Sequence, residues 1–181
     1  MENNGAQPQI EVFRSLYRAI ATGDADGFRT IASANPAVLS ERYLDTTPHN
    51  NAQRMFFEAI EGNQVAIASF LLAYGASIDV AENADGPEGI IVRAVQNRAI
   101  DSVRWLLSQG ATINHVVDGK TRCFAITSAA RKGNLEVVRL LVEHGADFNS
   151  VWADKNALSF AIEYGHKDIE AYLRSIGAKE P

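Results

Sequence analysis

The chain has 181 residues, of which 46% are hydrophobic and 22% charged, a composition typical of an ordinary soluble protein rather than of a disordered segment. Its net charge of −5 is unevenly divided, because residues 1–90 hold 5 basic and 12 acidic side chains whereas residues 91–181 hold 12 basic and 10 acidic. No basic stripe dominates, no basic run followed by an apolar one opens the chain, and no apolar stretch approaches the roughly 18 residues of a membrane span. We therefore expect a cytoplasmic protein that binds neither nucleic acid nor membranes.

Apolar residues at helical spacing predict pairs of short helices, one pair after another along the chain. The predicted pairs span about residues 10–36, 54–76, 89–111, 124–146 and 156–178. Residues 1–9 are polar and predict a disordered tail, and residues 179–181 form a short C-terminal tail.

A common register relates the five pairs. Each has an alanine in its first helix, and an apolar residue stands three positions before it and another twelve after it. These alanines are Ala19, Ala59, Ala94, Ala129 and Ala161. Sixteen residues after the alanine, four pairs have Gly-Ala, where glycine suits the left-handed conformation that ends a helix. The first pair has Asn35-Pro36 instead, and asparagine is the next best residue for that backbone.

The fourth pair carries the clearest family signature. Ala129-Ala130, Gly133, the run Leu135–Leu141 and Gly145-Ala146-Asp147 stand where the ankyrin-repeat pattern has them, so this stretch closely resembles one ankyrin repeat. No pair keeps the Thr-Pro-Leu-His opening of that family, and Arg98 stands where glycine is usual. The resemblance implies an all-α fold: an α-solenoid of stacked helix-turn-helix repeats with loop or β-hairpin fingers, forming a single domain over residues 10–178.

The connections between pairs vary in length, as loops of repeat proteins do. The first carries an insertion around residues 40–50, and the second, 77–88, is acidic. The third holds the hairpin turn signal Asp118-Gly119-Lys120, and the fourth holds Trp152.

The two ends of the array differ from its middle. Lys167, Glu170 and Arg174 replace apolar residues of the fourth pair, which predicts a polar outer face and a capping repeat. The first pair, with Gly27 and Thr30 in its second helix, also has the character of a cap. Two capped ends predict a monomer.

No catalytic chemistry is indicated. The four histidines are far apart in sequence and show no metal-ligand spacing, so neither a metal nor another cofactor is expected. His166 follows Gly165 and predicts a structural hydrogen bond. The single cysteine, Cys123, predicts a small buried or half-buried residue. With no phosphate loop and no nucleophile motif, we do not expect an enzyme.

Two functions remain open. Proteins resembling this one mostly hold another protein, so the first is a protein-binding module that uses its concave face and loop tips. The second is a dedicated inhibitor, such as an immunity protein that neutralises a cognate bacterial toxin or enzyme. The resemblance places the contact residues two and three positions after each alanine and at the loop tips. They are Glu61, Gly62, Gln96, Asn97, Arg131, Lys132, Glu163 and Tyr164 on the helices, and Tyr43, Asp85, Glu88, Lys120 and Trp152 at the tips.

Trp152 and Tyr164 fall outside all the apolar columns, and exposed aromatic residues are common binding hot spots. The alternative for Trp152 is that its ring only folds over its own loop.

Overall fold

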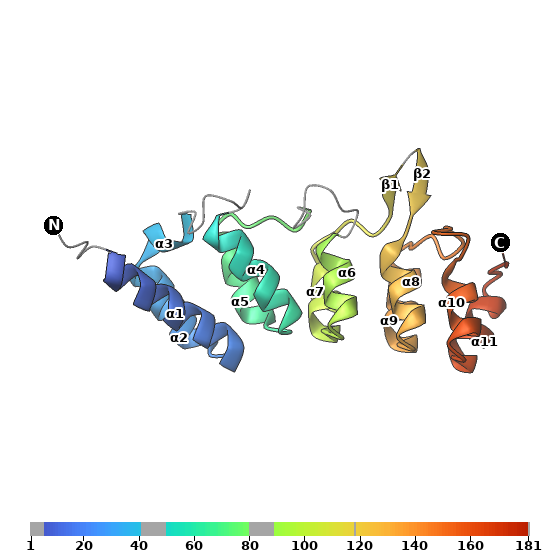
Figure 1. The fold of residues 1–181 in the computed structure, drawn as a ribbon, viewed down its shortest axis with the longest axis horizontal. Helices are drawn as coiled ribbons and strands as arrows, with labels where there is room; N and C mark the ends of the chain where they lie inside the picture. Colours follow the sequence, from blue (N-terminus) through green and yellow to red (C-terminus); the bar gives the residue numbers. More distant parts are fainter. Residues whose placement is uncertain (1–5, 41–49, 80–88, 118, 181) are drawn as a thin grey trace. The chain divides into compact units, whose positions relative to one another are not determined.

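The computed structural model describes residues 6–40, 50–79, 89–117 and 119–180. The chain divides into two compact units, Met1–Ile78 and Asp79–Pro181, each built mainly from helix pairs joined by tight turns (Figure 1). The expected all-α character is confirmed: the described secondary structure is helical apart from one short hairpin and one isolated β-bridge.

The first unit contains two helix pairs and one short extra helix. The elements are α1 (Ala6–Thr22), α2 (Ala25–Ala34), α3 (Pro36–Ser40), α4 (Asn51–Glu61) and α5 (Val65–Ala73). Phe28 on α2 is fully buried and meets Phe70 on α5 edge-on, with ring centroids 5.9 Å apart. Helix α1 begins at Ala6, so residues 6–9 are helical rather than part of the expected disordered tail.

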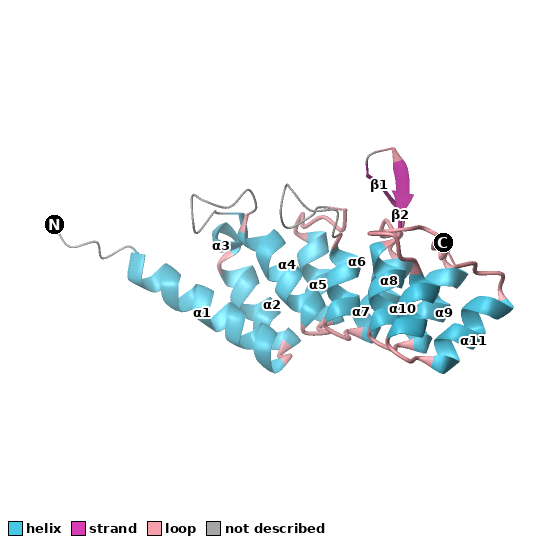
Figure 2. Cartoon of the chain, turned by 45° about the vertical axis from the view of Figure 1, so that its right-hand side comes forward, coloured by secondary structure: helices cyan, strands magenta, loops and turns pink. Residues whose placement is uncertain are grey.

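The second unit contains three helix pairs and a hairpin. The elements are α6 (Ile90–Gln96), α7 (Ile100–Ser108), β1 (His115–Val117), β2 (Lys120–Arg122), α8 (Phe124–Arg131), α9 (Leu135–Glu143), α10 (Ala157–Glu163) and α11 (Lys167–Ser175). Strands β1 and β2 pair antiparallel, with Val116 opposite Thr121, and form a finger that extends away from α8 (Figures 1 and 2). The turn expected beside Gly119 is therefore present, and Gly119 has a φ of +69°.

The turn inside each helix pair explains the alanine register. All five register alanines are buried, and the carbonyl oxygen of each accepts a hydrogen bond from the amide five residues later, at 2.7–3.1 Å. The donors are Asp24, Gln64, Ala99, Asn134 and His166. The residue before each donor has positive φ, as this type of helix stop requires. These residues are Gly23, Asn63, Arg98, Gly133 and Gly165, so the third pair places an arginine in the left-handed region.

The second helices end by the same type of bond in four of the five pairs. The carbonyl oxygens of Leu71, Leu106, Leu141 and Leu173 each accept from the alanine that follows a positive-φ glycine. The expectation for Asn35 was wrong, because its φ is −136°. Pro36 follows it and disfavours helical backbone in the residue before, and the Asn35 side chain instead donates to the carbonyl oxygen of Ile31 at 2.9 Å.

Candidate functional site

The contact residues predicted on the helices occupy equivalent positions in four of the repeats. Glu61, Gln96, Arg131 and Glu163 are the last residues of α4, α6, α8 and α10. The residues that follow them are the C-caps: Gly62, Asn97, Lys132 and Tyr164. The sixteen-residue register therefore located a structurally equivalent position in each first helix.

The predicted loop tips are only partly visible. Lys120 is exposed at the start of β2, and Trp152 is 45% exposed between α9 and α10. Tyr43, Asp85 and Glu88 lie outside the described residues.

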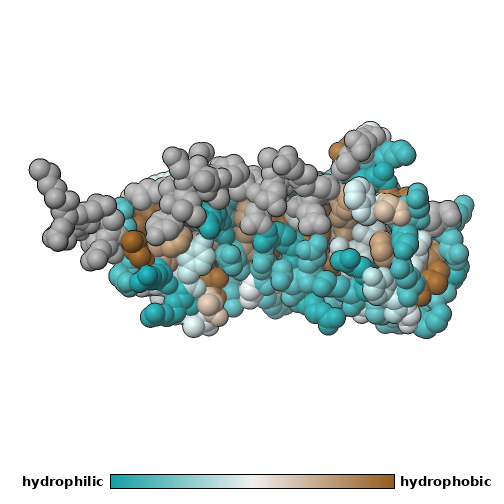
Figure 3. All heavy atoms as spheres, in the orientation of Figure 1, coloured by the Kyte–Doolittle hydropathy of each residue, from teal (hydrophilic) through white to brown (hydrophobic). Residues whose placement is uncertain are grey.

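Exposed large hydrophobic side chains are concentrated in the second unit. Of the five in the described part of the chain, only Tyr74 belongs to the first unit. The others are Val116, Trp152, Ile162 and Tyr164. On the face drawn in Figure 3, the described surface is mostly hydrophilic and apolar residues form small separate patches. Single exposed side chains, among them Trp152 and Tyr164, are therefore available for contact.

Three of the predicted residues, two from different repeats and one from a connecting loop, line one cavity of about 150 Å³ in the second unit. Gln96 comes from α6, Arg131 from α8, and Trp152 from the loop before α10. The remaining walls are the rings of Phe124 and Phe160 and the hydroxyl side chains of Thr127 and Ser128. We call this site the aromatic cavity. Sequence reasoning missed both phenylalanines, since each belongs to a short helix without a distinctive motif.

The loop that carries Trp152 is a tight turn. Trp152 and Lys155 exchange two main-chain hydrogen bonds, of 2.8 and 3.0 Å, and the two residues between them, Ala153 and Asp154, have φ values of +49° and +61°. Turns of this kind usually contain Asn-Gly, so Ala153 holds a backbone conformation that is costly for alanine.

The ring of Trp152 packs partly on its own surroundings. It meets Phe124 edge-on with centroids 5.1 Å apart, and the Arg122 guanidinium lies 5.9 Å from its centroid. The ring thus covers the start of α8, in partial agreement with the alternative that it folds back, while nearly half of the residue stays open to solvent.

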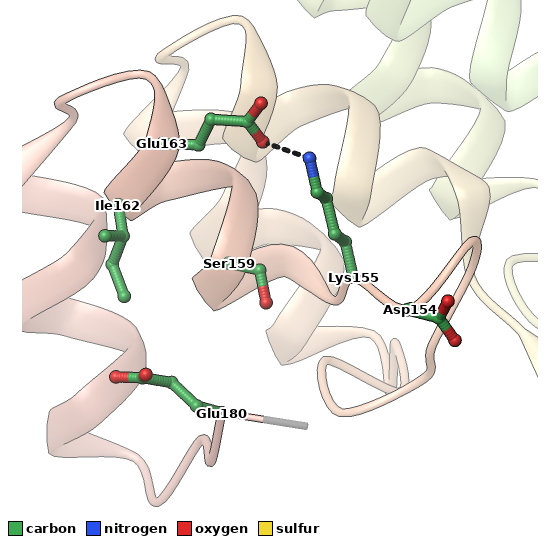
Figure 4. A pocket seen from close by; sticks show the side chains of 6 residues that line it. All are labelled: Asp154, Lys155, Ser159, Ile162, Glu163 and Glu180. Atoms are coloured by element: carbon green, nitrogen blue, oxygen red, sulfur yellow. Dashed lines mark hydrogen bonds and ion pairs between the residues drawn. The ribbon is translucent and has the colours of Figure 1, made fainter.

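A second cavity, of about 440 Å³, is lined by residues of α10, of the Trp152 turn and of the C-terminal end of the described chain (Figure 4). Glu163 lines it, but the carboxylate is engaged by the Lys155 ammonium at 2.7 Å. Asp154, Ser159, Ile162 and Glu180 complete the lining. With three carboxylates and one lysine, this second cavity is acidic.

Tyr164 lines neither of these cavities. It is 53% exposed, and its ring is stacked on the imidazole of His166 with an interplanar angle of 13°. The expectation that His166 makes a structural hydrogen bond is confirmed, because its Nε2 lies 3.1 Å from the carbonyl oxygen of Arg131.

In the first unit, Glu61 and Gly62 line a cavity of about 340 Å³ between α1 and α4. Tyr17 also faces it, and burial raises the pKa of the Tyr17 phenol. No member of the second unit contributes to this cavity.

No reactive group stands out. Burial raises the pKa of the Cys123 thiol to about 11, so the expected buried cysteine is confirmed and its reactive thiolate is suppressed at neutral pH. Within the described ranges, no three His, Cys, Asp or Glu side chains gather in a way that could hold a metal ion. None of the described helices is both long and apolar enough to cross a bilayer.

Comparison with known families agrees with the geometry. The family described as ankyrin repeats, in three copies, matches residues 91–180. This stretch begins within α6, ends beyond α11 and contains the three helix pairs of the second unit. No curated protein matches the chain.

Proposed function

Because this chain is an ankyrin-repeat protein, with three repeats in residues 91–180, we propose that it acts by binding a partner protein and catalyses no reaction. Ankyrin repeats are generally protein-protein interaction modules. The proposed contact surface consists of the C-terminal ends of α6, α8 and α10 together with the tips of the β1–β2 finger and of the Trp152 turn.

The observation that carries this proposal is the aromatic cavity. Gln96 and Arg131 were selected from sequence as contact positions in two repeats and Trp152 as a loop-tip position, and all three line it. A half-exposed tryptophan beside an arginine has the composition of an interface hot spot, where truncation typically costs about 2 kcal/mol or more of binding free energy.

We extend the proposal to the residues outside the second unit. The α1–α2 and α4–α5 pairs have the same hydrogen bond from the fifth residue back to a buried alanine, which supports counting them as additional repeats of one domain over residues 10–178. Glu61 and the loop residues Tyr43, Asp85 and Glu88 are then contact positions for the same partner.

The test is affinity capture from the native cell extract with the tagged chain, followed by titration of the purified partner. Changing Trp152 and Tyr164 together to alanine is expected to weaken binding at least about tenfold, as loss of a hot spot does. The free energy of unfolding should change by no more than about 1 kcal/mol, because about half of each residue is open to solvent.

Reversing Arg131 and Lys132 to glutamate is expected to slow association and to alter its salt dependence. The matched control is Arg104→Glu on the second helix α7, whose exposed ion pair with Glu136 contributes little to stability. If the Trp152 and Tyr164 double variant binds the isolated partner as tightly as the native chain does, the contact surface lies elsewhere. If no protein is retained specifically, the binding function itself is contradicted.

The narrower role considered from sequence, a dedicated inhibitor of a toxin or enzyme, rests on resemblance alone. No described contact favours inhibition over holding, so the proposal extends to binding only. We retain the monomeric state and the cytoplasmic location as parts of the proposal.

A further inference from the structure

We propose that the aromatic cavity receives one large apolar side chain of the partner, and that a carboxylate beside that side chain pairs with Arg131. The inference rests on the proposed protein-binding function and names the chemistry of the segment that is bound: an acidic peptide segment with an apolar anchor.

The volume of the aromatic cavity suits a single side chain. A dry apolar cavity of about 150 Å³ in another protein binds a molecule of the size of benzene. The cavity here has about the same volume and is walled by the rings of Phe124, Trp152 and Phe160. A phenyl ring or a leucine side chain would therefore fill it and meet aromatic walls, which favour edge-to-face contacts.

Three of the four polar side chains that line the cavity have no hydrogen-bond partner within the described chain. The Thr127 hydroxyl is occupied, because it donates to the carbonyl oxygen of Phe124 at 3.0 Å. The side chains of Gln96, Ser128 and Arg131 make no hydrogen bond or ion pair with any described residue. An amide, a hydroxyl and a guanidinium thus line the cavity beside the three aromatic rings, with their hydrogen-bonding capacity free.

The charge of the cavity selects an acidic partner. Arg131 is the only charged residue among those that line it, and no carboxylate does. A second cation is near, since Arg122 lies on the Trp152 ring and its buried Nε has no partner among the described residues. A guanidinium can bind a carboxylate through two parallel hydrogen bonds, a stronger and more directional contact than a lysine offers.

The second cavity has a different charge. Asp154, Glu163 and Glu180 line it, and Lys155 is the only cation there. Like charges would repel an acidic segment that continued toward it, which favours a carboxylate beside Arg131 instead.

The Trp152 wall is held in place before any ligand binds. Two main-chain hydrogen bonds between Trp152 and Lys155 close the turn. The two residues between them, Ala153 and Asp154, have the positive φ values that this turn requires. A wall that is already ordered loses little freedom on binding, which favours recognition of a short segment.

The experiment uses the full chain and four synthetic peptides with blocked ends. The test peptide is acetyl-Gly-Glu-Phe-Glu-Gly-amide. In the three control peptides, glutamine replaces both glutamates, lysine replaces both glutamates, or alanine replaces the phenylalanine. Binding is followed by NMR through the indole N–H of Trp152, which is assigned with the Trp152→Phe variant.

The test peptide is expected to shift the Trp152 indole signal saturably and to bind about tenfold tighter than the glutamine peptide, the effect of one charge-assisted contact. The lysine and alanine peptides should bind more weakly still. Arg131→Gln should abolish the preference for glutamate over glutamine. Arg104→Gln, which removes the same charge from α7, outside both the cavity and the proposed contact surface, should preserve it.

Equal binding of the acidic and basic peptides, or no shift of the Trp152 signal with any peptide, overturns the inference. So does loss of the preference in the Arg104→Gln variant, because the recognition would then be general charge attraction. Occupation of the cavity by a second copy of the chain also overturns it and would appear as self-association in sedimentation. None of these results contradicts the binding function, which the capture experiment tests separately.

Discussion

The imidazole of His166 donates a hydrogen bond from Nε2 to the carbonyl oxygen of Arg131, 3.1 Å away in the preceding repeat. The ring lies directly over Gly133, where an added Cβ would come within 2.5 Å of its Cε1. His166 also supplies the main-chain donor to Ala161 that closes its own helix pair. One residue therefore joins the turn of the last repeat to the turn of the one before.

This contact predicts coupled effects on stability. His166→Ala should lower the free energy of unfolding by about 1 kcal/mol, the usual net contribution of a hydrogen bond. Gly133→Ala should cost more than the roughly 1–2 kcal/mol of left-handed backbone, because the methyl group also meets the ring. In the double variant the two losses should be less than additive, as urea titrations of all four proteins would show. Strict additivity would mean that the ring does not lie over Gly133 in solution.

Replacing Arg98 with glycine is expected to stabilise the fold. Its φ of +58° is costly for a side chain with a Cβ, and its guanidinium makes only an exposed contact of 3.4 Å with the carbonyl oxygen of Lys132. Arg98→Gly should therefore raise the free energy of unfolding by about 0.5–1 kcal/mol, after the greater flexibility of glycine in the unfolded chain is counted. Asn63→Gly is the control, since asparagine tolerates a φ of +59° and should gain less. Thermal unfolding of both variants measures the two gains in stability. A larger gain for Asn63→Gly than for Arg98→Gly would contradict the assignment of strain to Arg98.

Making the outer face of α11 apolar is expected to lower the solubility of the protein. Glu170 pairs with Lys167 at 2.9 Å and with Arg174 at 3.2 Å, while Ile169 and Leu173 face inward. Replacing Lys167, Glu170 and Arg174 together with leucine should add an exposed apolar stripe and cause self-association, measurable by light scattering as concentration rises. Glutamine at the same three positions is the control and should stay monomeric. A monomeric leucine variant would show that this face is not open to solvent.

The buried Cys123 thiol makes the stability of the folded state depend on pH in the alkaline range. Burial raises its pKa from 9.0 to about 11, so the folded state favours the neutral thiol. The stability that this shift contributes is fully present below about pH 9 and is lost as the pH rises through about 11. Between these values the native chain should lose more stability than the Cys123→Ala variant does, as denaturant titrations at pH 8 and pH 10.5 would measure. At pH 8, iodoacetamide should label the folded chain slowly and the urea-unfolded chain fast. Equal labelling rates in the two states would contradict the burial.

The sequence by itself determined the repeat and its register. An alanine in each first helix, an apolar residue three positions before it and, in four of the five pairs, a Gly-Ala sixteen positions after it are local steric requirements, so they are visible in the sequence alone. The equivalent positions at the ends of α6, α8 and α10 followed from that register without any tertiary information. The register also identified Arg98 as an exception, because it stands where glycine is usual. Its backbone takes positive φ in spite of the side chain.

Only the tertiary structure decided which of these positions meet. Phe124 and Phe160 are 36 residues apart in sequence, and nothing in their helical patterns indicates that their rings line one cavity with Trp152. Glu163 was expected at the contact surface, but it lines a different cavity, where the Lys155 ammonium pairs with its carboxylate. Such convergence depends on how adjacent repeats stack and on the path of each loop, and neither is encoded in the spacing of apolar residues along the chain.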